Sequence, residues 1–498
     1  MKYLKIERIT FFIIFFLIII WSIFTLPYSP IAWMDEVILS SYAHSFVNGN
    51  GIAMELDHGE PVPFYGPVFF VLQALFIKLV GFTPFGLRLC NCLFSFLSVI
   101  LLGKIQKTLN VKDCARYLVL LLFATDTLFL SNSHSGRMEF VALFFVLVAY
   151  WLYLEPRFNY IFKAFLMSLS LSVAFMTTPR VAVICIPIAI AELYKILTKR
   201  YWSLTLVYVS VPILLYCIWI VYAFGSIDSM FSFFTTPNSS SPNASLASRF
   251  ININLHLFIP KWQYPLIFTS ILCVIHSIRY KYLNRILLYV SPICIFYLIV
   301  FDTGTYSTLI IPFYLLIIAV CYSEVQLRSE KKQIMVFNTL IICCMALNIA
   351  IFVVKSINVM STINTRDHSE LSAWLKNQIP AGSRVAGTYA FYYAAIDNNC
   401  SYRKIENESL SAKALHDELI NDFKVDYLII SEDQFTPYML ECYSFFDKEK
   451  ELVGYYKPSN KDLWLNKLID RFVKKYSILS SDPSYACEVY KIDRNKTH

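Results

Sequence analysis

Long apolar runs, separated by short polar segments, recur through the first 355 residues of the chain. Runs of this length are typical of helices that cross the hydrocarbon core of a bilayer. We therefore expect a polytopic α-helical membrane protein with about eleven transmembrane helices, some of them short enough to be tilted or kinked. The expected helices span residues 11–28, 86–103, 117–131, 138–154, 161–177, 181–197, 203–224, 264–278, 286–301, 306–322 and 335–354.

Residues 356–498 show a different pattern, in which short helical and strand-like segments alternate. Helices are expected at 369–378, 410–421 and 463–474, and strands at 384–389, 426–431 and 487–492. This alternation predicts a small α/β domain, so we divide the chain into a membrane domain, 1–355, and a soluble domain, 356–498. The expected strands carry no glycine-rich phosphate loop, so the pattern gives no sign of a nucleotide site.

The composition agrees with a membrane protein, because 57% of the residues are hydrophobic and only 16% are charged. The net charge of +8 lies entirely before residue 355. If the N-terminus is inside, eighteen Lys and Arg residues of this part fall in inside segments and six in outside segments. Because basic residues favour the cytoplasmic side, the count predicts outside loops at 29–85 and 225–262 and an outside C-terminal domain. The same bias explains the positive charge without nucleic-acid binding.

One apolar segment, Phe64–Val80, is ambiguous because it is nearly long enough to cross the membrane. Counting it as a span would move every later basic cluster to the outside, against the positive-inside bias. The segment also follows two prolines and contains Gln73 and Lys78. We therefore expect a helix that lies in the outer interface, within the loop from 29 to 85.

Most of the thirteen cysteines lie in or beside apolar spans, where they act as small buried hydrophobic residues. Cys400, Cys442 and Cys487 lie in the C-terminal part. One disulfide and one free thiol are an option among these three if that part is outside the cell.

The acidic pair Asp35-Glu36 directly follows the first apolar run. A carboxylate beside a bilayer is costly unless it pairs with a cation, binds a metal or faces water. The pair is therefore the first candidate for chemistry, and the charge count places it outside. The alternative is a solvated loop acid or a group that caps a helix.

Several short motifs occur in an order that links the chain to a known family. After the acidic pair comes FYGPVFFVLQALFIKLVGFTPFGLRL, which ends in Phe85-Gly-Leu-Arg88, and then SHSGRMEFVALFFVLVAYWLY, in which Arg137-x-Glu139 opens a span. In this order the chain resembles the GT-C membrane glycosyltransferases, in particular the protein O-mannosyltransferases, the lipid A aminoarabinose transferases and the Rgt-like bacterial glycosyltransferases. The resemblance covers most of the chain and is densest over residues 30–180.

Members of that family take a sugar from a polyprenyl-phosphate donor and transfer it, with inversion, to a hydroxyl of an acceptor. The resemblance implies that Asp35 is the general base, with Glu36 in a supporting catalytic role. The chemistry also needs cations near the donor phosphate, and Arg137, Arg180 and Lys78 are candidates on the outer side. Each of the three could instead anchor a helix end at the interface.

Five further residues of the outer side are weaker candidates for substrate contacts. They are His58, Glu60, Tyr65, His134 and Tyr306. The first two could help Asp35 to hold a divalent metal, although no tight ligand spacing supports one and no cofactor is certain. The two tyrosines could stack on sugar or lipid, although aromatic residues are common at membrane interfaces. Thr305 stands where family members often carry a basic residue, so the donor sugar stays open.

Two other functions remain in competition. A transporter or lipid flippase would use the acidic pair to couple protons, but such proteins usually show internal repeats and ionisable groups near the bilayer midplane, and we find neither pattern in the sequence. An O-antigen ligase or polymerase would centre on a long late outer loop rich in basic residues, whereas 225–262 holds only Arg249 and Lys261. The leading hypothesis is a glycosyltransferase of a bacterial plasma membrane, whose acceptor is a lipid, a glycan or a protein.

Overall fold

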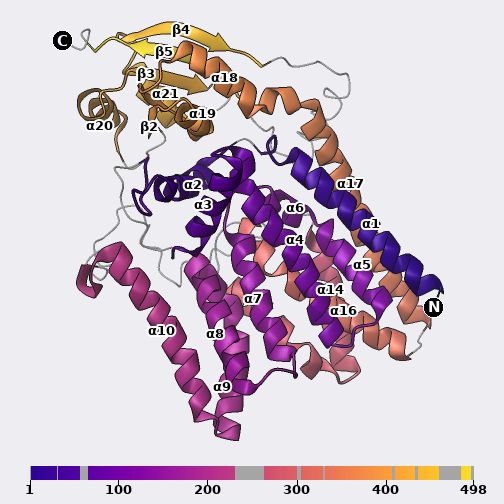
Figure 1. The fold of residues 1–498 in the computed structure, drawn as a ribbon. Helices are drawn as coiled ribbons and strands as arrows, with labels where there is room; N and C mark the ends of the chain where they lie inside the picture. The colour runs from indigo at the N-terminus through magenta and orange to yellow at the C-terminus, as the bar shows by residue number, and fades with distance from the viewer. Residues whose placement is uncertain are drawn as a thin grey trace.

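The computed structural model describes residues 2–30, 32–56, 66–229, 263–299, 304–328, 331–405, 410–431, 436–458 and 484–494. Figure 1 shows a bundle of long helices beneath a smaller domain that contains a β-sheet. Two short helices, α2 (Met34–Val47) and α3 (Val68–Val80), lie between the bundle and the sheet domain. Helix α1 (Lys2–Thr25) runs from the N-terminus at the edge of the bundle toward the sheet domain.

The bundle contains the apolar helices that the hydrophobic pattern predicts. Besides α1, its helices in the described ranges are α4 (Pro84–Thr108), α5 (Asp113–Ala124), α6 (Thr127–Ser133), α7 (Glu139–Leu154), α8 (Tyr160–Thr177), α9 (Ala182–Lys199), α10 (Trp202–Phe224), α14 (Tyr264–Arg279), α15 (Leu287–Ile299), α16 (Ile311–Arg328) and α17 (Lys331–Ser361). Short 3-10 turns lead into three of them: η1 (Pro179–Val181) before α9, η3 (Leu283–Arg285) before α15 and η4 (Gly304–Leu309) before α16.

The prediction of a polytopic α-helical membrane protein is confirmed, since each expected span falls on one of these helices. Among the described residues, seven helices are long and apolar enough to cross a membrane, or eight if the bent pair α5 and α6 is one span. The remaining three expected spans coincide with α7, α14 and α15, which have only 13 to 16 residues. Helix α3 has 13 residues, about 20 Å, and so is too short to cross a hydrocarbon core of about 30 Å.

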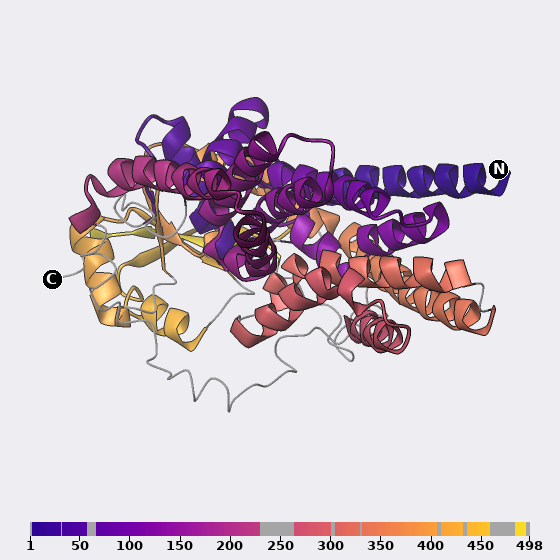
Figure 2. The same ribbon diagram turned by 90° about the horizontal axis from the view of Figure 1, so that it is seen from below.

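Burial separates the inner helices of the bundle from the outer ones. In the span that contains α16, 94% of the residues are buried inside the protein, whereas the corresponding value for α10 is 11%. Outer helices expose large apolar residues such as Phe16, Leu206 and Ile342, which in a membrane would contact lipid. Figure 2 shows α1 and α10 at the margins of the bundle.

The bend between α5 and α6 depends on a buried acid. The two helices meet at 54°, and Asp126 lies between them as the N-cap of α6. Its Oδ1 accepts hydrogen bonds from the backbone N–H groups of Leu128 and Phe129, both at 2.9 Å. Its Oδ2 accepts a hydrogen bond from Gln263 at 2.7 Å. The bend therefore has a specific polar support, and α6 leads directly into the loop that precedes α7.

The C-terminal domain is built around a five-stranded mixed sheet in the order β2-β1-β3-β5-β4. Strand β1 is parallel to β2 and β3, while β5 is antiparallel to β3 and β4. The strands are β1 (Arg384–Gly387), β2 (Ser401–Lys404), β3 (Tyr427–Ser431), β4 (Lys450–Tyr456) and β5 (Cys487–Ile492). The helical segments are η5 (Ile363–Arg366), α18 (His368–Gln378), η6 (Tyr389–Phe391), α19 (Tyr392–Asp397), α20 (Ala412–Asp417), the π-helical η7 (Glu418–Asp422) and α21 (Pro437–Ser444).

Alternate residues of β1 and β3 face two different cores, as the two-residue repeat of a strand requires. Ala386 and Leu428 face the core that contains α20 and α21. Val385 and Ile429 face the opposite core, which also contains residues of α2, α3, α18 and α19. The second core therefore continues from the sheet domain into the helices that cover the bundle.

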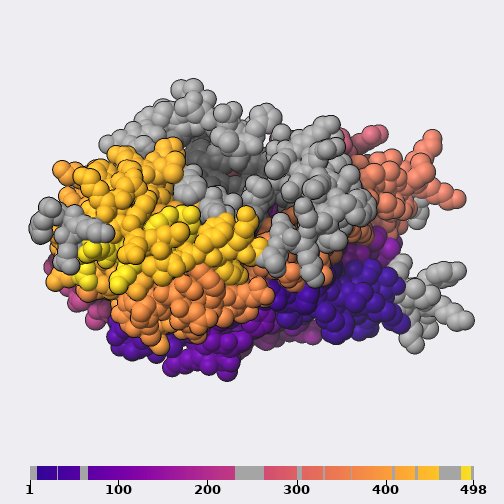
Figure 3. Space-filling model, turned by 90° about the horizontal axis from the view of Figure 1, so that it is seen from above, coloured from indigo at the N-terminus to yellow at the C-terminus, as the bar shows by residue number. Residues whose placement is uncertain are grey.

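Hydrogen bonds connect the C-terminal domain to α2 and to the segment that follows it, residues 48–56. The Tyr393 hydroxyl lies 3.1 Å from Ser40 Oγ, and Tyr392 donates to Glu55 at 3.1 Å. Arg403 donates to the backbone carbonyl of Leu56 at 2.6 Å. In Figure 3 the orange and yellow C-terminal domain covers one part of the outer face of the molecule. The domain is thus packed onto the helix that carries Asp35.

Most elements expected in the C-terminal part are present. Strands β1, β3 and β5 and helices α18 and α20 match the predicted segments, whereas β2, β4, α19 and α21 were not predicted. The predicted helix 463–474 lies outside the described residues. Helix α17 continues past the expected domain boundary at 355 to Ser361. Cys400, Cys442 and Cys487 are buried, and none of the three forms a disulfide with another described cysteine.

The cap at the bend can be tested by replacing Asp126. Asp126→Ala removes the acceptor for two N–H groups and for Gln263, so we expect a loss of about 2 kcal/mol of stability or more. Asp126→Asn keeps a side-chain oxygen that can cap the helix, so it should lose less stability than Asp126→Ala. Thermal unfolding of the purified full chain in detergent measures both variants, and equal losses would contradict the capping role.

Acid should weaken the contact between the two domains through His368. Burial in the second core lowers the pKa of His368 to about 4, and its ring packs against Tyr393 and Tyr485. Because an exposed histidine titrates near 6.5, the unfolded chain binds more protons between about pH 6.5 and 4, and stability falls as the pH falls through this range. His368→Gln should flatten the dependence of the melting temperature on pH in this window. Above pH 7 the melting temperatures of the variant and the parent protein should differ by a constant amount. The same slope of melting temperature against pH in both proteins between about pH 6.5 and 4 would disprove the role of His368.

Candidate active site

The candidate active site starts in the first turn of α2. Trp33 precedes the helix in an extended conformation, and Asp35 and Glu36 follow at its N-terminus, where the helix dipole stabilises negative charge. Consecutive residues of a helix point about 100° apart, so the two carboxylates face different surroundings. The Asp35 side chain is 33% exposed, whereas the Glu36 side chain is completely buried.

Glu36 forms a buried ion pair with Arg88 of α4. Arg88 Nε lies 3.1 Å from both carboxylate oxygens of Glu36, and Arg88 Nη2 lies 3.0 Å from Oε1. The same guanidinium donates through Nη1 to the carbonyl of Leu26, directly after α1, at 2.8 Å. The pair therefore fixes the ends of three helices relative to one another.

Glu36 also holds the loop that precedes α7. The backbone N–H of Gly136 donates to Glu36 Oε2 at 3.2 Å. A Cβ atom at Gly136 would lie 2.7 Å from Glu36 Cγ, so a larger residue cannot fit there without movement. The Tyr393 hydroxyl of the C-terminal domain reaches Glu36 Oε1 at 3.5 Å. Glu36 thus positions surrounding segments and, being buried, is not open to a substrate.

Arg137, next to this glycine, contacts four side chains from different parts of the chain. Its Nη1 lies 2.5 Å from Asp35 Oδ2, and its Nε donates to Glu139 Oε1 at 2.8 Å. Its Nη2 donates to the Tyr306 hydroxyl at 2.9 Å, and the guanidinium lies 5.2 Å from the centre of the Trp33 ring. Arg137 is only 4% exposed, so these contacts fix its position.

Arg180 reaches the same cluster from η1. Its guanidinium carbon lies 3.9 Å from the centre of the Tyr306 ring, a close cation–π contact. Arg137 lies 5.1 Å from the centre of that ring, so Tyr306 separates two cations. Within the described ranges, Arg180 forms no ion pair with a carboxylate, whereas Arg137 is neutralised by two. Among the described residues, the cluster therefore offers one positive charge without a carboxylate partner, beside a partly exposed carboxylate.

Four of the residues predicted from the sequence are brought together here: Asp35, Arg137, Arg180 and Tyr306. Lys78 is exposed on α3 and has no contact in the described structure with this cluster. His58, Glu60 and Tyr65 lie outside the described residues.

His134 serves the loop rather than the cluster. Its Nδ1 lies 2.7 Å from the Leu130 carbonyl, and its Nε2 lies 3.1 Å from Thr25 Oγ1. Burial lowers the pKa of His134 to about 4, so the ring is neutral near pH 7 and adds no positive charge. Both ring nitrogens are used to hold the loop against α1.

The described residues contain no cluster of three His, Cys, Asp or Glu side chains that could bind a metal. Between the carboxylates of Asp35 and Glu139 lies the Arg137 guanidinium, which supplies the positive charge that a metal would bring. The metal hypothesis therefore still depends on His58 and Glu60, which the structure does not describe.

Sequence reasoning did not assign a role to two important residues. Arg88 stands in one of the motifs that carried the resemblance, Phe85-Gly-Leu-Arg88, and this was the only signal for it. Trp33 had no signal beyond its position two residues before Asp35. The role of Arg88 depends on Glu36, 52 residues away, and that of Trp33 on Arg137, about 100 residues away.

Known structures with the same fold were found over nearly the whole chain. ArnT from Cupriavidus metallidurans in the apo state superposes with a TM-score of 0.63 and 9% identity, covering 99% of this chain and 98% of that one. The same ArnT bound to undecaprenyl phosphate gives a TM-score of 0.57 and 10% identity, covering 97% of both chains. An Archaeoglobus fulgidus oligosaccharyltransferase tethered with an acceptor peptide gives 0.52 and 8%, covering 97% of this chain and 88% of that one.

At sequence identities of 8–10%, these similarities establish a shared fold and nothing further. The chain thus shares its fold with ArnT and with the oligosaccharyltransferase, in agreement with the fold that the order of the sequence motifs predicts. No protein-family model matches the sequence, and neither does any curated protein sequence.

The buried ion pair can be tested through stability. Glu36→Gln leaves the Arg88 charge buried without a full partner, and breaking such pairs typically costs about 3–5 kcal/mol. Asp113→Asn breaks the Arg116 pair, whose acid is 49% exposed, and should cost less than about 1 kcal/mol. Thermal unfolding of the two full-length variants in detergent compares them. Similar melting temperatures would show that the Glu36 pair contributes no more than a surface pair.

Proposed function

We propose that this chain is an inverting glycosyltransferase that moves a sugar from a polyprenyl-phosphate donor to a hydroxyl of a lipid, glycan or protein acceptor. The observation that carries the proposal is the group of Asp35, Arg137 and Arg180 around Tyr306, with one cation unpaired among the described residues. The fold that the chain shares with an ArnT bound to undecaprenyl phosphate supports the donor class.

Asp35 is the proposed general base. Its carboxylate is partly exposed, and the ion pair with Arg137 favours the ionised form, which can accept a proton. The rigid support of α2 by Glu36 and Arg88 keeps this carboxylate in one place. A substrate hydroxyl that displaces part of the Arg137 contact would lie within hydrogen-bond reach of Asp35.

Arg180 and Arg137 are the proposed phosphate contacts. A guanidinium carries five N–H groups, and the contacts of Arg137 with Asp35, Glu139 and Tyr306 use four. Arg180 supplies a charge that no described carboxylate neutralises. Charge-assisted hydrogen bonds from two arginines would stabilise the negative charge that develops on the leaving phosphate.

In the proposed reaction the acceptor oxygen forms a bond to the anomeric carbon on the face opposite the phosphate. The bond between that carbon and the phosphate oxygen breaks, and both electrons leave with the polyprenyl phosphate. The acceptor proton passes to Asp35, and the configuration at the anomeric carbon inverts. Lys78, exposed on α3, remains a candidate for contact with the donor lipid.

The proposed site of reaction is the outer face of a bacterial plasma membrane. The excess of basic residues in the inside segments supports this orientation, which places Asp35 and the C-terminal domain outside. The acceptor would enter between the first outer loop and the C-terminal domain, which meet at Glu55 and Tyr392.

Asp126 is the one observation that favours the alternative of a transporter or flippase. It is a buried carboxylate at a bent span, and buried acids at broken helices mark ion or substrate sites in many transporters. However, two backbone N–H groups and Gln263 already engage its oxygens. A capping role accounts for these contacts.

The base can be tested with Asp35→Asn, which keeps the shape of the side chain and removes its basicity. Transfer of radiolabelled sugar from a polyprenyl-phosphate sugar extract should fall by about 10²–10⁴-fold. Binding of undecaprenyl phosphate to the variant should persist, and Asp422→Asn, an exposed acid remote in the C-terminal domain, should leave transfer unchanged. Full transfer by a folded Asp35→Asn protein would rule out this base.

The phosphate contact can be tested with Arg180→Gln. Loss of one charge-assisted contact should weaken binding of undecaprenyl phosphate to the full chain by about 10–100-fold. Arg157→Gln, which removes an 86% exposed arginine elsewhere, is the matched control and should bind normally. Native mass spectrometry of the detergent-purified proteins measures both, and equal affinities would exclude Arg180 from the phosphate site.

A further inference from the structure

A groove of about 1080 Å³ lies between α1, α4 and α5, far from the candidate active site. It is lined by the middle of α1, from Arg8 to Ile19, the last turns of α4 and the first turns of α5. Helix α1 begins beside the groove and ends near Leu26, whose carbonyl binds Arg88. Arg8 and Leu26 are thus about 27 Å apart along the helix, so the end of the groove at Arg8 and the Asp35 cluster lie at opposite ends of the bundle.

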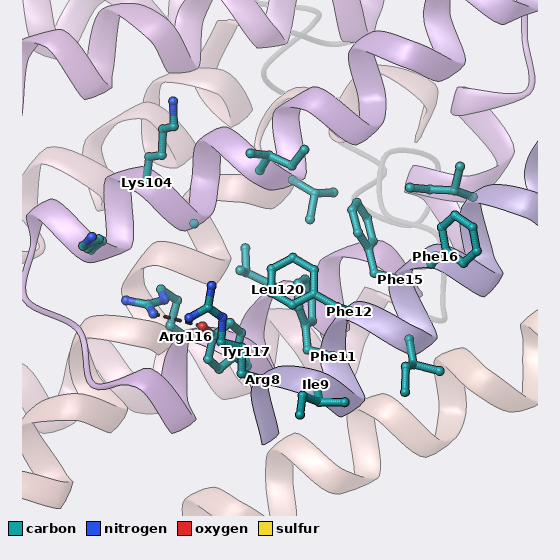
Figure 4. A pocket seen from close by; sticks show the side chains of 16 residues that line it. Arg8, Ile9, Phe11, Phe12, Phe15, Phe16, Lys104, Arg116, Tyr117 and Leu120 are labelled. Atoms are coloured by element: carbon teal, nitrogen blue, oxygen red, sulfur yellow. Dashed lines mark hydrogen bonds between the residues drawn. The ribbon is translucent and has the colours of Figure 1, made fainter. Parts of the chain in front are cut away.

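One end of the groove is basic. Arg8, Lys104, Lys107 and Arg116 all line it, and each comes from an inside segment of the predicted topology. Lys104 and Lys107 are three residues apart and therefore project from the same side of α4. Figure 4 shows Arg8, Arg116 and Tyr117 together at one end of the pocket.

Among the described residues, one acid partly offsets these four cations. Arg116 lies 2.7 Å from Asp113, and it also donates to the Tyr117 hydroxyl at 3.3 Å. Within the described ranges neither Lys104 nor Lys107 forms an ion pair, and both are exposed; Lys104 Nζ lies 5.4 Å from the centre of the Trp151 ring. The basic end thus keeps a clear positive excess, which suits an anionic group.

The rest of the groove is apolar. Phe12, Phe16 and Ile100 line it and are 50%, 61% and 51% exposed, so they present an apolar surface toward the bilayer. Figure 4 shows Phe15 and Phe16 at the end away from the arginines. From Arg8 to Ile19, the lining residues of α1 extend about 16 Å along the helix, close to half of a hydrocarbon core of about 30 Å.

A charged end at the membrane surface and an apolar wall one leaflet deep together match one kind of ligand. We propose that this groove binds an anionic phospholipid of the leaflet opposite the active site, with its phosphate on Lys104, Lys107, Arg8 and Arg116 and its acyl chains along the phenylalanines of α1. The volume is at the upper end of the usual range of ligand sites, about 300–1,000 Å³. The inference does not depend on the proposed transfer reaction.

The competing explanation is a general attraction between cytoplasmic basic loops and anionic lipids. The two explanations differ in which lysines matter. Lys112, in the same inside segment as the groove lysines, and Lys199, in a different one, are both exposed and do not line the groove. General attraction would treat the two pairs of lysines alike, whereas a site in the groove depends on Lys104 and Lys107.

The test measures lipid binding to the delipidated full chain in detergent by native mass spectrometry. The probes are palmitoyl-oleoyl phosphatidylglycerol and the zwitterionic phosphatidylcholine with the same chains. The variants are Lys104→Gln with Lys107→Gln, the matched control Lys112→Gln with Lys199→Gln, and Ile100→Trp, which fills the apolar part without changing charge. Thermal unfolding checks that each variant is folded.

We expect one phosphatidylglycerol to bind the parent chain at least about tenfold more tightly than phosphatidylcholine. The Lys104→Gln/Lys107→Gln variant should bind phosphatidylglycerol about tenfold more weakly or worse, and Ile100→Trp should also weaken the binding. The Lys112→Gln/Lys199→Gln control should bind this lipid as tightly as the parent chain. Equal losses of phosphatidylglycerol affinity in the two double lysine variants would overturn the proposed site and favour general electrostatic attraction. Displacement of the lipid by glycerol 3-phosphate, or full affinity in Ile100→Trp, would overturn the assignment to a lipid.

Discussion

The arrangement of the end of the bundle next to the C-terminal domain depends on one buried ion pair, Glu36 with Arg88. Its atoms contact the end of α1 through Leu26, the loop before α7 through Gly136, and the C-terminal domain through Tyr393. A buried charge pair is rarely a source of net stability, but it tolerates few alternative arrangements, because any displacement leaves a charge without a partner. Here the pair acts as a common reference point for segments that lie far apart in the sequence.

This fixed frame explains why the neighbouring residue can be chemically available. Asp35 lies in the same turn of α2 as Glu36, but its side chain points toward Arg137 and solvent. The helix therefore fixes the position of Asp35 while its carboxylate remains accessible. Arg137 is held in turn by Glu139 and Tyr306. Preorganised cations and a fixed acid are the features that electrostatic catalysis requires, since no rearrangement is needed as charge develops.

The helices of the bundle were predictable because long apolar runs have few other solutions in a membrane. The central strands of the C-terminal domain were predictable for a similar reason, since segments such as 426–431 are too apolar to be exposed. The peripheral strands β2 and β4 are polar or exposed along much of their length, and only pairing with β1 and β5 defines them. Asp35 could be identified from the sequence because a carboxylate beside a bilayer is energetically costly. The roles of Arg88 and Trp33 arise from contacts with residues far away in the sequence, which no local pattern contains.

The shared core of the two domains has a consequence for how the protein is made. Tyr485, Cys487 and Val489 belong to the same core as Val37, although about 450 residues of chain separate them. A ribosome that adds residues in order therefore releases α2 long before the last strand exists to cover it. The surroundings of the acidic pair can be completed only after synthesis has almost ended, so the nascent chain lacks a finished site throughout its insertion into the membrane.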